Sequence, residues 1–166
     1  NMFFVNCIGD TSGSYNWNIS DLMNSYFTQC WGSTQKSTAV NTFATGFVIS
    51  SLRCNGLFFN GCMAINNNSH GFHINDPGST GPTNIVFNGC QFGSLSNGAN
   101  GNGRAGSGYG LYISGALPNK IRVNGGVFDG NASGPFFHSS AQTDIFITGN
   151  PVGCKTVGTG TASFAG

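Results

Sequence analysis

Phe87-Asn88-Gly89-Cys90 is one copy of a four-residue phrase that occurs six times along the chain. The intervals between the last residues of successive copies are 23, 32, 28, 36 and 24 residues. Periods of this size are typical of solenoids, in which each repeat forms one turn and contacts only its neighbours. The copies occupy residues 4–7, 27–30, 59–62, 87–90, 123–126 and 147–150.

A second phrase, which begins with glycine, lies between these copies. It occupies residues 46–49, 71–74, 110–113 and, more loosely, 134–137, so each turn carries at least two short strands. Within the first phrase Ile85 and Phe87 share one face of the strand, and Val86 lies on the other. The same alternation predicts an inward column that contains Met2, Phe4, Leu57, Phe59, Ile85, Phe87, Ile121, Val123, Ile145 and Ile147.

These repeats favour an all-β fold, a parallel β-helix of about six turns. Asn and Gly residues would supply the positive φ angles that its corners need. A β-sandwich is the alternative, but it predicts turns between antiparallel neighbours and not rungs that match in one direction. We expect the β-helix over residues 1–153, with an exit segment or linker at 154–166. Because a solenoid normally needs a polar cap at each end, we also expect a segment of a longer polypeptide.

Composition favours one β-rich domain and excludes several functions. The chain has 166 residues, and charged residues make up 7% of it with a formal net charge of +1. This balance offers no basic face for nucleic acid. All five acidic residues are Asp, and the 27 glycines argue against helices. No apolar run approaches the roughly 20 residues that span a bilayer, so we expect no membrane partner.

The longest excursion from the repeats covers residues 93–108 and contains the pattern GxGxxG at 101–106. A dinucleotide-binding turn would need a helix after the pattern, but another strand phrase follows. We therefore interpret 93–108 as a flexible surface loop and 33–45 as a similar one. No other motif indicates a cofactor.

Six cysteines could suggest a disulfide framework. Four of them, Cys7, Cys30, Cys62 and Cys90, hold the same place in successive copies of the phrase and would stack at about 4.8 Å. Side chains in parallel register point the same way, so free buried thiols are favoured over disulfides. The phrase offers no zinc ligand set, and we predict no metal. Cys54 and Cys154 lie outside the column, and their state is open.

The phrases at 85–92 and 110–114 resemble the right-handed parallel β-helices of the pectin-lyase-like superfamily, and bacteriophage tailspikes in particular. The closing stretch 147–153 is similar to the Gly and Pro phrase that ends many phage β-helix domains. The resemblance implies a homotrimer on the virion surface, outside the cell, which contacts other virion proteins and bacterial surface polysaccharide. Three functions remain open: a tailspike or fibre-like adhesin, a polysaccharide depolymerase, and a purely structural virion decoration.

A depolymerase of the hydrolase type would need two carboxylates about 5 to 9.5 Å apart. The weak catalytic candidates are Asp76, Asp129 and Asp144. Asp144 falls at the same place in its repeat as Lys120, so a stacked ion pair is the simpler expectation for it. We therefore lean against an enzyme in this segment, although a site between subunits would also supply a pair.

Candidate ligand-binding residues are His70, His73, Tyr112 and Arg53. His70, His73 and Asp76 form the densest polar group of the sequence, and His73 should face outward between Val48 and Tyr112. The group could bind sugar or transfer protons, and the alternative is an ordinary exposed strand position. Aromatic rings suit sugar stacking, so Trp17, Trp31 and Tyr112 are further candidates.

The outward column of the first phrase is apolar at five of six positions: Phe3, Tyr26, Phe58, Val86, Arg122 and Phe146. A ladder of apolar residues on one face favours a partner surface over isolated exposure. We predict that Phe3, Tyr26, Phe58, Val86 and Phe146 form a subunit interface, with coverage by the chain's own loops as the alternative.

Overall fold

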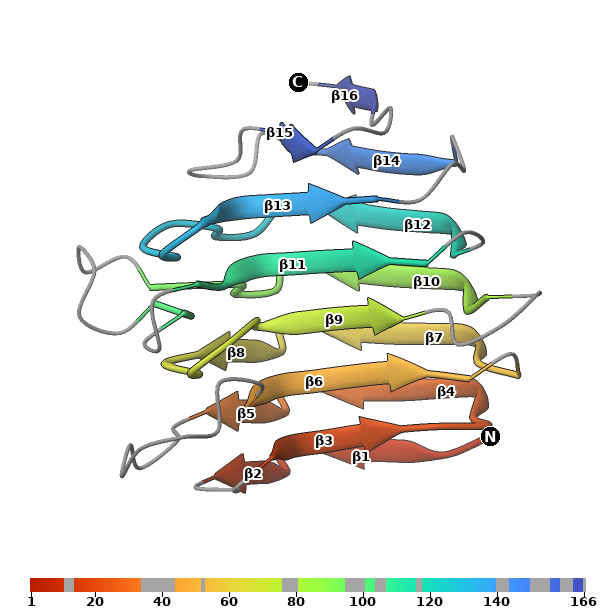
Figure 1. Ribbon diagram of the computed structural model, residues 1–166. Helices are drawn as coiled ribbons and strands as arrows, with labels where there is room; N and C mark the ends of the chain where they lie inside the picture. Colours follow the sequence, from red (N-terminus) through yellow and green to blue (C-terminus); the bar gives the residue numbers. More distant parts are fainter. Residues whose placement is uncertain are drawn as a thin grey trace.

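A computed structural model shows a stack of parallel β-strands (Figure 1). It describes residues 1–10, 14–33, 44–51, 53–75, 81–94, 101–103, 107–115, 118–139, 144–149, 156–158 and 163–165. Within these ranges the chain is all-β and contains no helix, so the predicted fold class is confirmed at this level. No helix of the described ranges could cross a membrane.

The strands form three parallel sheets that the chain visits in turn. Sheet A contains β1 (Phe3–Val5), β4 (Met23–Thr28), β7 (Asn55–Asn60), β10 (Thr83–Asn88), β12 (Asn119–Asn124), β14 (Ile145–Thr148) and β16 (Ser163–Ala165). Sheet B contains β2 (Ile8–Asp10), β5 (Trp31–Ser33) and β8 (Met63–Ile65). Sheet C contains β3 (Tyr15–Ile19), β6 (Thr45–Ser50), β9 (Phe72–Asn75), β11 (Tyr109–Ser114), β13 (Gly134–His138) and β15 (Thr156–Gly158).

The strand register confirms the alignment of both phrases. In sheet A, Phe87 pairs with Phe59 on one side and with Val123 on the other. In sheet C, Phe72 pairs with Phe47 and Leu111. The sequence did not predict sheet B, whose row continues beyond β8 only through isolated bridges at Gln91 and Val127.

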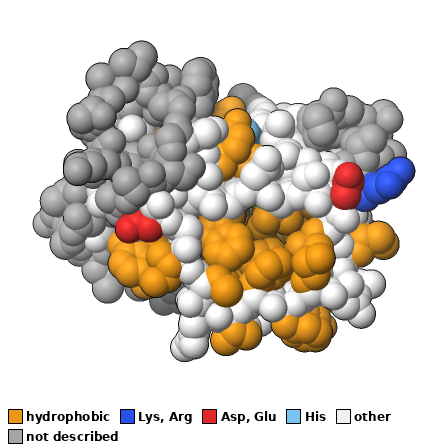
Figure 2. Space-filling model, turned by 90° about the horizontal axis from the view of Figure 1, so that it is seen from below, with side chains coloured by type: hydrophobic (Ala, Val, Ile, Leu, Met, Phe, Trp, Pro, Cys, Tyr) orange, Lys and Arg blue, Asp and Glu red, His pale blue; other side chains and the backbone are white. Residues whose placement is uncertain are grey.

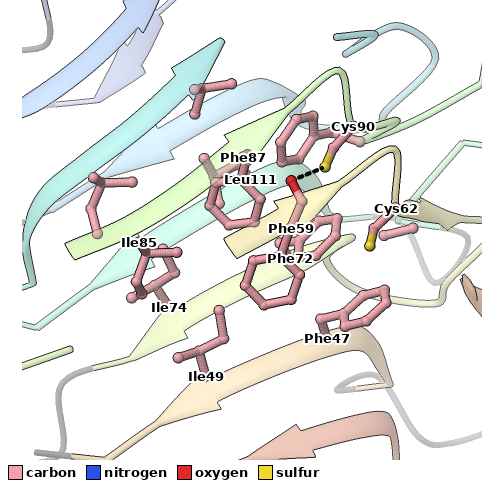
Figure 3. Close-up of a cluster of buried hydrophobic side chains, with 14 of the residues drawn as sticks. Phe47, Ile49, Phe59, Cys62, Phe72, Ile74, Ile85, Phe87, Cys90 and Leu111 are labelled. Atoms are coloured by element: carbon pink, nitrogen blue, oxygen red, sulfur yellow. Dashed lines mark hydrogen bonds between the residues drawn. The ribbon is translucent and has the colours of Figure 1, made fainter. Parts of the chain in front are cut away.

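The core lies between the inward columns of sheets A and C (Figure 3). The rings of Phe27 and Phe59 stack 4.7 Å apart in one column, and those of Phe47 and Phe72 stack 4.5 Å apart in the other. Phe59 and Phe72 meet edge to face across the core. Met2 is an exception to the predicted inward column, because its side chain is 53% exposed. It belongs to the first turn, which has no described turn beneath it.

In each copy of the first phrase, the residue that follows the sheet A strand has a positive φ angle, as predicted for the corners. Gly is found there in the last four copies, whereas Asn6 (φ 53°) and Gln29 (φ 52°) stand in the first two. A left-handed conformation costs an L-residue roughly 1 to 2 kcal/mol, and Gly avoids this cost. The four glycines are Gly61, Gly89, Gly125 and Gly149.

A row of asparagines, of which Asn67 and Asn102 are buried, joins the turns beside sheet C. The Nδ2 of Asn67 donates to Oδ1 of Asn102 at 2.8 Å, and Nδ2 of Asn102 donates to Oδ1 of Asn131 at 2.9 Å. Asn102 also donates to the carbonyl of Phe92, so its amide links several segments. The part of the predicted surface loop at 101–103 is therefore buried, and the prediction of a flexible loop is wrong there. The rest of 93–108 that we expected to be flexible is only partly described.

This row explains the glycine that opens the second phrase. A Cβ on Gly71 would lie 2.7 Å from Nδ2 of Asn102, and one on Gly110 would lie 2.8 Å from Nδ2 of Asn131. Such contacts are closer than packed atoms tolerate. The glycines of sheet C therefore leave room for the asparagines of the next turn.

The two ends of the stack differ from the middle. The end at β1 gathers hydrophobic side chains at its centre (Figure 2), and Phe4, Cys7, Trp17 and Leu22 are only partly buried. At the other end, β15 and β16 pair with β13 and β14. Two short strands thus lie within 154–166, where we expected an exit segment or linker.

Candidate functional site

The outer face of sheet C carries five rings in mutual contact, which we call the aromatic cluster: His70, His73, Tyr109, Tyr112 and Phe137. The ring of His70 stacks on Tyr112 with centroids 4.2 Å apart and planes 5° apart. Tyr112 stacks in turn on Phe137 at 5.2 Å. All five side chains are half-buried, so each keeps some contact with solvent.

The strand register places the cluster. His73 pairs with Val48 and Tyr112, as predicted, and Tyr112 pairs with Phe137. His70 lies just before β9, and its Nδ1 accepts a 3.1 Å hydrogen bond from the backbone N–H of Tyr109. This bond holds the His70 ring parallel to that of Tyr112 and leaves Nε2 as the protonated nitrogen of neutral His70.

Polar groups border the cluster on one side. The Nε2 of His73 lies 2.8 Å from Oγ of Ser114, and Ser114 donates to Oδ1 of Asn75 at 3.1 Å. Within the described residues, Nε2 of His70 has no hydrogen-bond partner. The cluster therefore combines ring surfaces with amide, hydroxyl and imidazole groups that can bind hydroxyl groups.

Both histidines are held neutral. Burial lowers the pKa of His70 to about 3, with a further contribution from the charge of His73. Burial also lowers the pKa of His73 to about 4. An imidazole with such a pKa is a poor general base near neutral pH but a good neutral hydrogen-bond partner. The cluster therefore presents neutral imidazoles that can donate and accept hydrogen bonds near neutral pH.

Other residues predicted for this site lie elsewhere or are not described. Arg53 follows the carboxyl end of β6, and Ser50 at that end pairs with Asn75. His70 precedes the start of β9, so Arg53 and His70 lie at opposite ends of the strands of sheet C, and Arg53 is not near His70. Its proximity to His73 stays a prediction. Asp76 lies outside the described residues. Trp17 is partly buried and its ring packs on Phe47 at 5.6 Å, so it lies against the core and not in the aromatic cluster.

The remaining catalytic candidates do not form a pair. Asp129 lies two residues after Val127, the last bridge residue in line with sheet B. Its carboxylate accepts a 2.8 Å hydrogen bond from the N–H of Gly130. Asp144 directly precedes β14 of sheet A. The strand β13 of sheet C lies between these two carboxylates in the chain, so they occupy different faces of the stack.

The outer face of sheet A carries the predicted apolar column, which we call the outer ladder. Its residues pair in register from Phe3 to Phe146. Phe3 stacks on Tyr26 at 5.2 Å and Tyr26 on Phe58 at 4.9 Å, with planes 3° and 12° apart. Phe3 is 72% exposed, so hydrophobic rings do face solvent here. The outward direction of the column is confirmed, and its role as an interface remains a prediction.

A shallow groove of about 500 Å³ lies over the upper part of the outer ladder. Lys120, Arg122 and Asp144 line it together with Phe58, Val86 and Phe146. Lys120 and Asp144 are neighbours, because the backbone N–H of Ile121 bonds to the carbonyl of Asp144. Among the described residues their charged groups form no ion pair, so the predicted stacked pair is not formed.

The cysteine column is made of free thiols, as the register predicted. The Sγ of Cys62 donates to the carbonyl of Phe27 at 3.2 Å, and Sγ of Cys90 donates to that of Phe59 at 3.3 Å. Cys54 is also free and buried, and Cys154 lies outside the described residues. Burial raises the pKa of Cys30 to about 11 and also raises that of Cys90, so these two thiols are unreactive near neutral pH. The hydrogen bond with Cys90 lowers the pKa of Cys62 instead. In the described part of the chain, no group of three or more His, Cys or Asp side chains could hold a metal ion.

The sequence-based interpretation missed Tyr109 and Phe137 as members of the aromatic cluster. Phe137 stands at the same place in its phrase as His73 and Tyr112, and this signal was available. Tyr109 directly precedes its phrase, and only the turn of the backbone there brings its ring to Tyr112.

The chain matches no known protein-family model, no curated protein and no solved structure.

Proposed function

We propose that the chain is a right-handed parallel β-helix of the pectin-lyase-like kind, and that it acts as a bacteriophage tailspike or fibre-like adhesin. In this proposal it binds bacterial surface polysaccharide on the virion surface. The observation that carries the proposal is the aromatic cluster on sheet C, in which ring surfaces adjoin neutral hydrogen-bonding groups. Such a combination suits a sugar, because the rings pack on its C–H faces and the polar groups bind its hydroxyls.

The sheet C cluster supports binding better than cleavage. Its histidines are neutral, and among the described residues its polar partners are Ser114 and Asn75, neither of which is a carboxylate. Hydrolysis of a glycosidic bond would call for two close carboxylates. We therefore expect the protein to retain the polysaccharide without shortening it.

We further propose that three copies associate through the outer ladder of sheet A. A ladder of solvent-facing rings is costly for an isolated subunit, and burial against another copy would remove that cost. Assembly into a homotrimer would leave sheet C outside, where a surface polysaccharide and other virion proteins can reach it.

The test is binding of capsule or lipopolysaccharide from candidate hosts to the intact protein and to variants of Tyr112. Tyr112→Ala removes the ring that joins His70 to Phe137, and we expect at least a tenfold loss of affinity. Tyr112→Phe keeps the stacked ring and should bind almost as well as the unchanged protein. Thermal unfolding of both variants separates lost binding from lost folding. Equal affinity of all three proteins would contradict the proposal, and release of oligosaccharides during incubation would instead indicate a depolymerase.

A further inference from the structure

A second hollow lies where sheets A and B meet, in the first three turns. Its volume is about 390 Å³, and its lining includes Asn6, Ile8, Gln29, Trp31 and Met63. Ile8, Trp31 and Met63 pair in register on the outer face of sheet B. Ile8 is 66% exposed and Trp31 is 37% exposed, so apolar surface is open to solvent at this corner.

The polar part of the hollow comes from two corner residues in the left-handed conformation, which Asn adopts more readily than Gln. Asn6 and Gln29 have φ angles of 53° and 52°, at the position where the four later copies of the phrase have Gly. A side chain at this position has no structural necessity, because Gly61 and Gly89 close the same corner without one. Residues that hold a strained backbone conformation often serve a function.

The side chains of Asn6 and Gln29 are free to bind a ligand. Both residues are exposed, and within the described residues neither side-chain amide makes a hydrogen bond. A Cβ added to Gly61 would lie 3.8 Å from Cγ of Gln29, so the Gln29 side chain passes next to Gly61, which also lines the hollow. Each amide offers two donors and an acceptor.

We propose that this hollow binds a neutral saccharide ring, which packs on Trp31 and Ile8 and exchanges hydrogen bonds with the amides of Asn6 and Gln29. None of the described residues that line the hollow carries a charge, which favours a neutral sugar over a charged one. Amides that both donate and accept match the hydroxyl groups of a neutral hexose, and an indole ring suits its C–H face. This inference rests on the proposed polysaccharide binding and adds a second subsite on another face of the stack.

The test uses neutral hexasaccharides of glucose, galactose and mannose, with the fluorescence of Trp31 as the readout. Trp17 is the only other tryptophan and packs against the core, so Trp31→Phe identifies the signal that belongs to the hollow. We expect at least one of the three sugars to change the fluorescence of Trp31. The double variant N6G/Q29G should lose at least about tenfold in affinity, since each lost hydrogen bond contributes about a factor of five.

The same variant should keep or raise its melting temperature, because Gly suits both corners. Loss of binding with unchanged or higher stability cannot come from misfolding. Lys120→Gly is the matched control: it also replaces an L-residue with positive φ, at φ 54°, but lies in sheet A away from the hollow. It should leave saccharide binding unchanged.

The results separate this inference from the function that it rests on. If none of the sugars changes Trp31 fluorescence, or if N6G/Q29G binds as tightly as the unchanged protein, the subsite is wrong. Sensitivity of polysaccharide binding to Tyr112→Ala would then still support the aromatic cluster. If Tyr112→Ala binds normally while N6G/Q29G does not, the result supports the saccharide subsite in the hollow and shows that the aromatic cluster is not the binding site.

Discussion

The outer faces of sheets A and C both present a ladder of rings, yet they are built differently. On sheet A the rings of Phe3, Tyr26 and Phe58 stack on one another in a single column. On sheet C the rings stand beside histidines, and Ser114 and Asn75 border them. The first face resembles an interface that excludes water, and the second resembles a surface that recognises a hydrated ligand.

The largest expected effect is on assembly. Phe58→Asp places a carboxylate in the middle of the outer ladder, where burial against another copy would leave the charge unpaired. We expect the trimer to dissociate into monomers, as measured by light scattering or sedimentation. A variant that remains trimeric would remove the argument that sheet A is the interface. Far-UV circular dichroism should show that the monomer keeps its β structure.

The next effect concerns the close packing of Gly71, which lies between His70 and β9, against the neighbouring turn. Gly71→Ala would place a Cβ 2.6 Å from the carbonyl oxygen of Gly110 and 2.7 Å from Nδ2 of Asn102. We expect a loss of about 2 to 3 kcal/mol in the free energy of unfolding, because neither group can move freely.

Gly89→Ala is the control for that substitution. Gly89 has φ 57°, but a Cβ there would meet no atom within 4 Å. It should cost only about 1 kcal/mol, from the backbone conformation alone. Equal losses in the two variants, measured by chemical denaturation, would show that the close approach to Asn102 is unimportant.

Acid should destabilise the fold through the histidines on sheet C. The pKa values of His70 and His73 lie at about 3 and 4, below the value near 6.5 of an unfolded chain. The unfolded state therefore binds more protons between these values, and stability falls as pH drops from about 6.5 towards 3. The melting temperature should decline over this window, and H70N/H73N should flatten the decline. Tyr26→Ala, on sheet A, should leave its slope unchanged.

The smallest effect is a gain. Lys120 has φ 54° at the start of β12, a position that Asn24, Gly56 and Asn84 occupy in other strands of sheet A. Lys120→Gly removes the cost of the left-handed conformation but adds freedom to the unfolded chain, so we expect a net gain of at most about 1 kcal/mol. A loss of stability would mean that the Lys120 side chain makes a stabilising contact in the groove.

Much of the fold could be predicted because in-register stacking repeats the same residue types at the same places. The phrase that ends in Cys90 gave the register of sheet A, the direction of Val86 and the free thiols, since each depends only on alternation along a strand. Sheet B escaped prediction because its strands have three residues each, too few for an alternating pattern. The buried position of Asn102 escaped because polarity and neighbouring glycines are also typical of loops.

The candidate site was predictable only in part. His70, His73 and Tyr112 do meet, because two of them share one column of sheet C. Arg53 follows the end of the strand that is far from His70, and Trp17 packs against the core. Contacts between turns depend on which end and which face of a strand a residue occupies, and on the geometry of the corners. Neither follows from the spacing of residues along the chain.

The asparagine row beside sheet C has a counterpart on the edge of sheet A, and the two rows point in opposite directions. Beside sheet C each amide donates towards the later turn, from Asn67 to Asn102 to Asn131. Along sheet A the amides donate towards the earlier turn, from Asn124 to Asn88 at 2.7 Å and from Asn88 to Asn60 at 2.8 Å. Aligned amide dipoles add along a row, as peptide dipoles do along a helix. Because the two rows run in opposite directions, their amide dipoles oppose one another along the axis of the stack.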